Sequence, residues 1–189
     1  MSAFEYFSVA LSFVLGLGLT RLLLAALYVF RARERQRVHW IPILWAASIF
    51  LFQIQYWWAV FELRVLIEVW THGVFVTLVA LALLLFVAGA LVLPASDDHA
   101  KDDLLEYFHE DGRWALLAMA AYAALSLWAN WYLFGVSPMT WVGLMVVVFG
   151  IVAVTAFAAS NRRVLGAFSV AFLVLSVWAY LVLAPGAYQ

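Results

Sequence analysis

Six long apolar runs, separated by short polar stretches, constrain this chain more than any other feature of its sequence. The runs cover residues 5–30, 40–61, 71–93, 114–134, 139–159 and 164–184. Each is close to, or longer than, the roughly 20 residues that a helix needs to cross the hydrocarbon core of a bilayer. All four prolines lie at the edges of the runs, where a missing backbone N–H costs least. None of them interrupts a predicted span.

The composition excludes an ordinary soluble domain. Of the 189 residues, 68% are hydrophobic and 11% are charged, against roughly 45–50% and about 25% in a typical globular protein. We therefore predict an all-α, polytopic integral membrane protein: one transmembrane domain over residues 1–189, a bundle of six helices with short connections. Five spans would result if residues 139–184 did not form two helices, but Asn161, Arg162 and Arg163 between the last two runs favour six.

The basic residues predict the orientation, because Lys and Arg near the ends of spans resist translocation. The connections after the first, third and fifth runs contain Arg31, Arg33, Arg35, Arg37, Lys101, Arg113, Arg162 and Arg163. Arg64 is the one basic residue in a connection on the opposite side. We therefore expect both termini outside the cytoplasm, in the inner (plasma) membrane of a bacterium.

Most catalytic and cofactor chemistry lacks its residues in this sequence. The chain has no cysteine, which excludes disulfides, thiolate metal sites and cysteine nucleophiles. The histidines lie at the edges of the runs or in the connections, where they do not suit a haem held within the bundle, and no HExxH or GxSxG motif is present. We predict no catalytic residues and no cofactor, and we lean towards a protein that is not an enzyme. A formal net charge of −1 also argues against a nucleic-acid partner.

Small residues mark candidate faces for close helix packing. Ser8, Ser12, Gly16 and Thr20 recur every fourth residue in the first run, and Gly143 and Gly150 lie seven apart in the fifth. In a bilayer, small residues let helix backbones approach closely and let hydroxyls bond across the interface. These residues are expected either to pack helices within the bundle or to form the seam of an oligomer.

Polar residues inside the runs or directly at their ends are the candidates for a pore or pocket. They are Glu5, Arg21, Gln53, Gln55, Glu62 and Asn130. Arg21 lies inside its run, nearer to the cytoplasmic end than to the outer end. Such a charge either snorkels to the surface or pairs within a functional cavity. The spacing of Gln55, Trp58 and Glu62 places these three residues on one helix face.

The connection over residues 95–113 is predicted to be cytoplasmic and is acidic. Ser96 is a candidate cap for a short surface helix in which Leu104, Leu105 and Phe108 share one side. Asp98, His99, Asp102 and Asp103 are candidate ligands for a divalent cation, although their spacing fixes no ligand geometry. A solvated face that docks a partner through Asp102, Asp103 and Glu106 is the stronger expectation.

The run Arg31, Arg33, Arg35 and Arg37 is placed to contact anionic lipid headgroups at the cytoplasmic face. Together these features favour a non-catalytic subunit or assembly factor of a membrane complex, with a homo-oligomer or another membrane protein as partner. A homo-oligomeric channel or small-solute transporter is the alternative. A lipid-modifying enzyme, with Arg21 holding a phosphate, is a third hypothesis.

Overall fold

The computed structural model describes residues 3–67, 70–96, 103–133 and 135–183. The helices, in chain order, are α1 (Ala3–Ala32), α2 (Trp40–Leu66), α3 (His72–Leu91), α4 (Leu104–Tyr107), the π-helix η2 (Phe108–Gly112), α5 (Trp114–Tyr132), α6 (Trp141–Ala158) and α7 (Arg162–Leu183). The described residues form no β-strand, only one isolated backbone bridge between Arg37 and Asp103. The predicted all-α class is confirmed.

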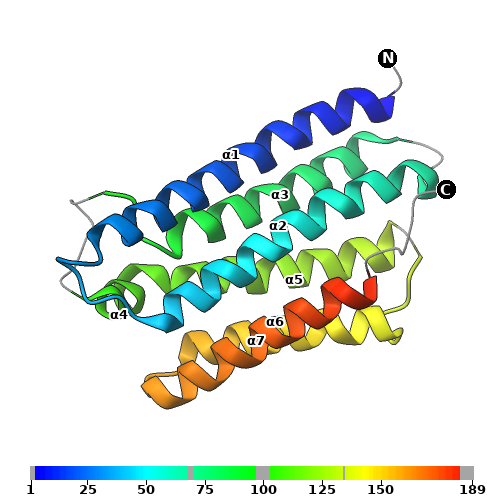
Figure 1. Ribbon diagram of the computed structural model, residues 1–189. Coiled ribbons are helices and arrows are strands. Elements are labelled where there is room, and N and C mark those ends of the chain that lie inside the picture. The colour runs from blue at the N-terminus through cyan, green and yellow to red at the C-terminus, as the bar shows by residue number, and fades with distance from the viewer. Residues whose placement is uncertain (1–2, 68–69, 97–102, 134, 184–189) are drawn as a thin grey trace.

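Six long helices lie side by side, and consecutive ones run in opposite directions (Figure 1). The first and last described residues therefore lie at the same end of the bundle. We call this the termini end; it includes residues 70–72, 133 and 135–140. The opposite end carries residues 31–39, α4, η2 and residues 159–163, and we call it the charged end.

Five of these helices are long and apolar enough to cross a membrane: α1, α2, α3, α6 and α7. This indicates an integral membrane protein, as the composition predicts. α5 is the exception among the six long helices, although its 19 residues make it about as long as α3 and α6. Asn130, Trp131 and Tyr132 at its C-terminal end lower its hydropathy.

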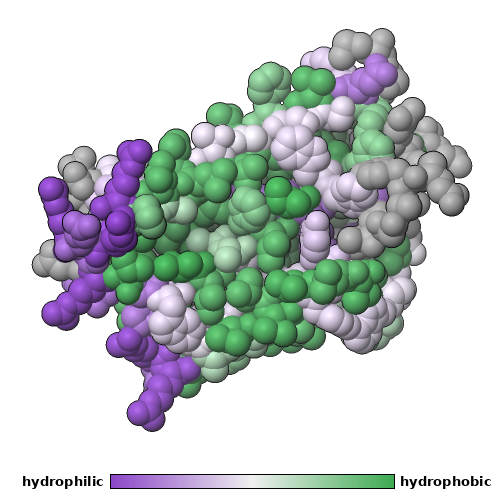
Figure 2. Space-filling view, viewed as in Figure 1, coloured by the Kyte–Doolittle hydropathy of each residue, from purple (hydrophilic) through white to green (hydrophobic). Residues whose placement is uncertain are grey.

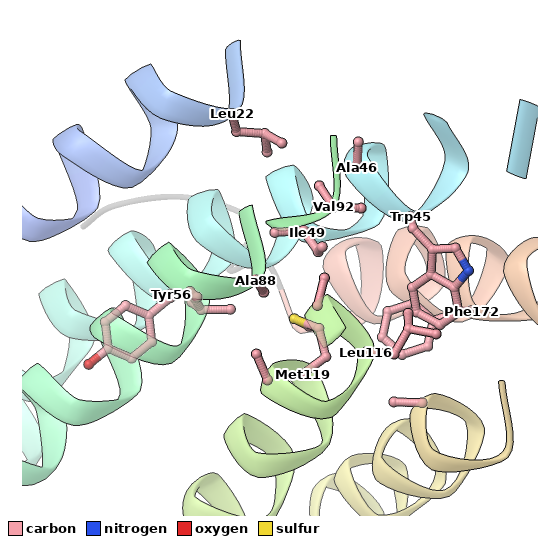
Figure 3. Close-up of a cluster of buried hydrophobic side chains, with 14 of the residues drawn as sticks. Leu22, Trp45, Ala46, Ile49, Tyr56, Ala88, Val92, Leu116, Met119 and Phe172 are labelled. Atoms are coloured by element: carbon pink, nitrogen blue, oxygen red, sulfur yellow. The ribbon is translucent and has the colours of Figure 1, made fainter. Parts of the chain in front are cut away.

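α3 occupies the centre of the bundle and packs against α1, α2 and α5. Val76, Leu83 and Val87 leave one side of α3 exposed, and small residues let its neighbours approach the other sides closely. Ala82 and Ala88 are completely buried, and Gly89 faces Leu22 of α1. Figure 3 shows Ala88 beside side chains from α1, α2 and α5, including Leu22, Ile49 and Leu116.

Aromatic side chains fill the core where α2, α5, α6 and α7 meet. Phe52 lies with its ring centroid 5.0 Å from that of Phe149 and 5.8 Å from those of Tyr122 and Phe172. Trp45 is fully buried, 4.5 Å from Phe172. Such tilted and edge-to-face pairs are favourable aromatic geometries. Trp45 and Phe52 of the second run are therefore packing residues.

The surface divides along the axis of the bundle. Figure 2 shows a hydrophobic band over the middle of the helices and a concentration of hydrophilic side chains at the charged end. Arg31, Arg33, Arg35 and Arg37 are all exposed there, and so are Arg162 and Arg163. A band of apolar surface bounded by charge is the pattern expected of a protein surrounded by lipid.

The helix α4 in the acidic connection is capped by Asp103. The Asp103 carboxylate accepts a hydrogen bond from the backbone N–H of Leu105 at 2.8 Å. Ser96 does not cap α4, and residues 97–102 lie outside the described part of the chain. Leu104 and Phe108 are almost fully buried against the bundle. The short helix is therefore docked into the protein and does not lie on the membrane surface by itself.

Candidate functional site

A polar pocket of about 430 Å³ opens at the charged end, and it is the candidate site. Its lining comes from α1, the end of α3, the segment after α3, α4, η2 and the start of α5. The lining residues are Arg21, Ala90, Leu91, Ala95, Ser96, Tyr107, Asp111 and Trp114. A pocket of this size is within the range of small-molecule sites, roughly 300–1,000 Å³.

Arg21 enters the pocket from the middle of a membrane-spanning helix. Its Nη2 donates to the backbone carbonyl of Ala90 at 3.4 Å, a long hydrogen bond. Its Nη1 is buried, and no acceptor for it is found among the described residues. A guanidinium that is partly removed from water with an unused donor is costly unless a ligand supplies an acceptor.

α4 and η2 bring Tyr107 and Asp111 to the same pocket. The hydroxyl of Tyr107 donates to the carbonyl of Leu91, the last residue of α3, at 3.0 Å. The backbone then widens into a π-turn, in which Arg113 N–H donates to Phe108 O at 2.7 Å. π-turns within helices are often found at functional sites. This turn carries Asp111, an exposed carboxylate, at the pocket.

The pKa of Tyr107 is affected by two charged residues that line the pocket, Asp111 and Arg21. Burial and, to a smaller extent, the negative charge of Asp111 raise the pKa of the Tyr107 phenol to about 12, whereas the positive charge of Arg21 acts in the opposite direction. The phenol therefore stays protonated and acts as a hydrogen-bond donor over the physiological range. Arg21 and Asp111 both act on it, so both charges lie around the same cavity.

A second polar cluster, around His39 and Arg162, lies at the charged end where α2 and α7 begin. His39 is buried, and its Nε2 accepts a hydrogen bond from Arg162 Nη2. Burial and the neighbouring Arg162 lower the pKa of His39, His109 adds to this effect, and Asp103 opposes it. Leu104 N–H donates to Arg37 O at 3.0 Å, so the acidic connection is pinned to the arginine-rich segment.

Gln53 lies inside the helix bundle. Its side-chain Nε2 donates to the carbonyl of Leu85 in α3 at 3.1 Å, and its Oε1 is buried with no partner within the described part of the chain. Gly18 and Gly89 make room for it, because a Cβ at these positions would lie 3.3 Å and 2.9 Å from Gln53 Nε2. The amide therefore joins α1, α2 and α3.

The remaining pore candidates lie towards or at the termini end. Gln55 and Asn130 are half-buried, and Glu5 and Glu62 are exposed. The indole N–H of Trp58 donates to Glu62 at 3.2 Å, which confirms that these two residues share a helix face. Ring contacts at this end include those of Phe7 with Trp70 and Phe75, with centroids 5.5 and 4.6 Å apart. Glu5 and Glu62 therefore lie at the opposite end of the bundle from the pocket that contains Arg21.

The small residues of α6 pack within the bundle. A Cβ on Gly150 would contact Ala123 of α5 at 3.4 Å, and Gly143 lies against the carbonyl of Pro138. The stripe on α1 behaves differently: Thr20 is exposed, and a Cβ on Gly16 would meet nothing within 4 Å. The buried side of α1 is formed by Leu11, Leu15, Gly18, Leu22, Ala25 and Val29.

Three of the four candidate metal ligands, Asp98, His99 and Asp102, lie outside the described residues, and the fourth, Asp103, caps α4. A search of the described residues finds no group of His, Asp and Glu suited to a metal ion. Glu106 is exposed on α4.

Sequence reasoning identified Arg21 but missed Tyr107, Asp111 and Trp114 as its neighbours. Asp111 was visible only as one acid among several in the connection, and Trp114 only as an aromatic residue at the end of a span. No local pattern predicts that the π-turn brings these residues to the third helix. The pairing depends on tertiary structure alone.

Comparison with known proteins adds no relative to this picture. No family model matches the chain, and comparisons with curated proteins and with solved structures also give no match.

Proposed function

We propose that this chain is a non-catalytic subunit or assembly factor of a membrane complex, and that it meets its partner at the charged end. The observation that carries the proposal is that specific contacts join the described segments of the charged end. Asp103 caps α4, Leu104 bonds to Arg37, and Phe108 is 1% exposed. These contacts hold exposed charges of both signs, including Glu106 and Arg35, on a rigid scaffold.

A rigid charged surface suits a protein partner. Side chains that are already ordered lose less entropy on binding, and complementary charge supplies specificity and fast association. The same surface lies next to the apolar band, so a partner anchored in the same membrane would reach it. Membrane lipids with anionic headgroups are further contacts for the exposed Arg31, Arg33, Arg35 and Arg37.

The proposal includes six spans with both termini outside the cytoplasm of a bacterium. α5 packs lengthwise against α3 and α6, and its 19 residues extend about 28 Å, close to the thickness of a bilayer core. Its terminal Asn130, Trp131 and Tyr132 are residues that suit the membrane interface. The exposed arginines then orient the charged end towards the cytoplasm.

Native mass spectrometry of protein extracted gently from its own membrane tests the proposal. We expect a companion chain at fixed stoichiometry, lost when Glu106→Lys and Glu110→Lys reverse two exposed charges at the charged end. Glu5→Lys and Glu62→Lys are the matched control, since they reverse two exposed acids at the termini end. A protein without any companion, or a companion that both double variants retain equally, would contradict the proposal.

One observation favours the second candidate, a homo-oligomeric channel or small-solute transporter. The stripe Ser8, Ser12, Gly16 and Thr20 does not form the buried side of α1, and Gly16 has open space around it. Small residues on a lipid-facing side allow a second copy to pack closely. The same mass spectra report copy number, and Gly16→Leu should dissociate such an oligomer and abolish flux in reconstituted vesicles.

A further inference from the structure

We infer that the pocket around Arg21 binds a phosphate ester that also carries an ammonium group, the chemistry of a phosphoethanolamine headgroup. This goes beyond the proposed subunit role and does not depend on it. The inference rests on the charges that line the pocket, on the absence of an ion pair between them among the described residues, and on the position of the pocket in the bundle.

The anionic half of the ligand is matched by Arg21. Its Nη1 is buried without an acceptor among the described residues, and its other contact is a single carbonyl at 3.4 Å. A guanidinium presents several N–H donors in a fixed plane that fits a phosphate group. A phosphate oxygen in the pocket would supply the missing acceptor.

The cationic half is matched by Asp111. Its carboxylate is exposed at the same pocket, and among the described residues no ion pair joins it to Arg21. Two opposite charges that line one cavity without contacting each other are complementary to a ligand that carries both charges. A purely anionic ligand would gain from Arg21 but would be repelled by Asp111.

The position of the pocket fits a headgroup of a membrane lipid. Arg21 belongs to a membrane-spanning helix, whereas Tyr107 and Asp111 belong to the short helices at the charged end. Trp114, at the start of α5, is 51% exposed and forms part of the lining. An indole at this depth is typical of the region where headgroup and acyl chains meet, so the pocket would receive the headgroup from the membrane.

The test measures lipid binding to the delipidated full chain by native mass spectrometry. Phosphatidylethanolamine and phosphatidylglycerol with the same acyl chains are titrated separately. We expect one tightly bound phosphatidylethanolamine, preferred by about tenfold, which corresponds to one charge-assisted hydrogen bond. Equal binding of the two lipids by the wild-type chain would overturn the inference.

Two variants assign the preference to the pocket. Asp111→Asn should abolish the preference by weakening phosphatidylethanolamine binding and strengthening phosphatidylglycerol binding, and the residue is exposed, so folding is preserved. Arg21→Gln should weaken both lipids by about tenfold, while Arg21→Lys should restore part of the affinity. Arg163→Gln is the matched control, since Arg163 is exposed at the same end and lies beside a separate groove. An unchanged lipid preference in Asp111→Asn would contradict the assignment.

A competition experiment with free phosphoethanolamine shows whether the site binds a membrane lipid or a soluble ester. If free phosphoethanolamine displaces the lipid and binds as tightly as the lipid does, the site serves a soluble ester. If it competes only weakly, the ligand is the membrane lipid. If free phosphoethanolamine and inorganic phosphate compete equally, the ammonium group is not recognised and the inference fails.

Discussion

At the scale of single residues, Gln53 shows how a polar side chain in a membrane helix can serve packing. Its amide lies between Gly18 and Gly89 and hydrogen-bonds to the backbone of α3. Interhelical hydrogen bonds of this kind hold membrane helices together, because the apolar side chains gain little over lipid contact. We therefore assign the glutamine to the junction of three helices.

The first prediction tests this junction. Gly89→Ala should lower the free energy of unfolding by about 1–3 kcal/mol, because its Cβ would lie 2.9 Å from Gln53 Nε2 in a well-packed core. Gly16→Ala is the matched control on a helix surface with open space, and it should stay within about 1 kcal/mol of the wild type. Thermal unfolding in detergent measures both, and equal effects would argue against a tight junction.

The second prediction concerns pH and His39. Because burial and Arg162 lower the pKa of His39 in the folded chain, the unfolded chain binds the proton more readily. The folded state is therefore most stable above the unfolded pKa of about 6.5 and loses stability as the pH falls towards the lowered folded value. The unfolding temperature should decrease when the pH is lowered from about 7.5 to about 5.5.

His39→Gln isolates this effect, because glutamine can still accept a hydrogen bond from Arg162 but does not titrate. The variant should lose stability less steeply over the same pH range than the wild type does. Parallel curves for the two proteins would show that carboxylates alone cause the pH dependence.

At the scale of helices, α3 organises the bundle because small residues face its neighbours. Ala88 is completely buried, while the adjacent Val87 is 40% exposed on the lipid-facing surface. The sequence predicted this helix but not which of its faces is enclosed, since α3 is apolar on every side. In a bilayer, hydropathy alone does not distinguish a lipid-facing from a protein-facing leucine.

The third prediction compares these two neighbouring positions. Ala88→Leu should destabilise the protein by about 1–3 kcal/mol, because the added atoms must displace packed side chains. Val87→Leu adds one methylene towards lipid and should change the unfolding free energy by less than about 0.5 kcal/mol. Thermal unfolding of the two variants under the same conditions makes the comparison, and similar losses would contradict the central position of α3.

Helix boundaries were largely predictable, whereas the contacts of the acidic connection were not. The first predicted run, residues 5–30, corresponds to Ala3–Ala32, and the fourth, residues 114–134, corresponds to Trp114–Tyr132. Hydropathy and proline positions are local signals, and they are strong in membrane helices. The cap at Asp103, the π-turn and the contact of Tyr107 with α3 depend on residues distant in sequence, which no local pattern contains.

At the scale of the whole molecule, the proposed function depends on which side of the membrane the charged end faces. The bundle has a charged end with an ordered surface and a polar pocket, and a termini end with aromatic contacts. If the charged end faces the cytoplasm, the arginines follow the positive-inside rule and the pocket meets the inner leaflet. If α5 did not cross the membrane, the connection between α5 and α6 would lie on the same side as η2.

Single-cysteine labelling tests this orientation most directly, because the chain has no cysteine of its own. Ser137→Cys lies in the connection between α5 and α6, and Glu34→Cys and Ser160→Cys lie at the charged end; all three positions are exposed. With a membrane-impermeant maleimide on intact bacterial spheroplasts, we predict labelling of Ser137→Cys alone, and labelling of all three after lysis. Labelling of the charged-end positions in intact spheroplasts, or protection of Ser137→Cys, would contradict the six-span orientation.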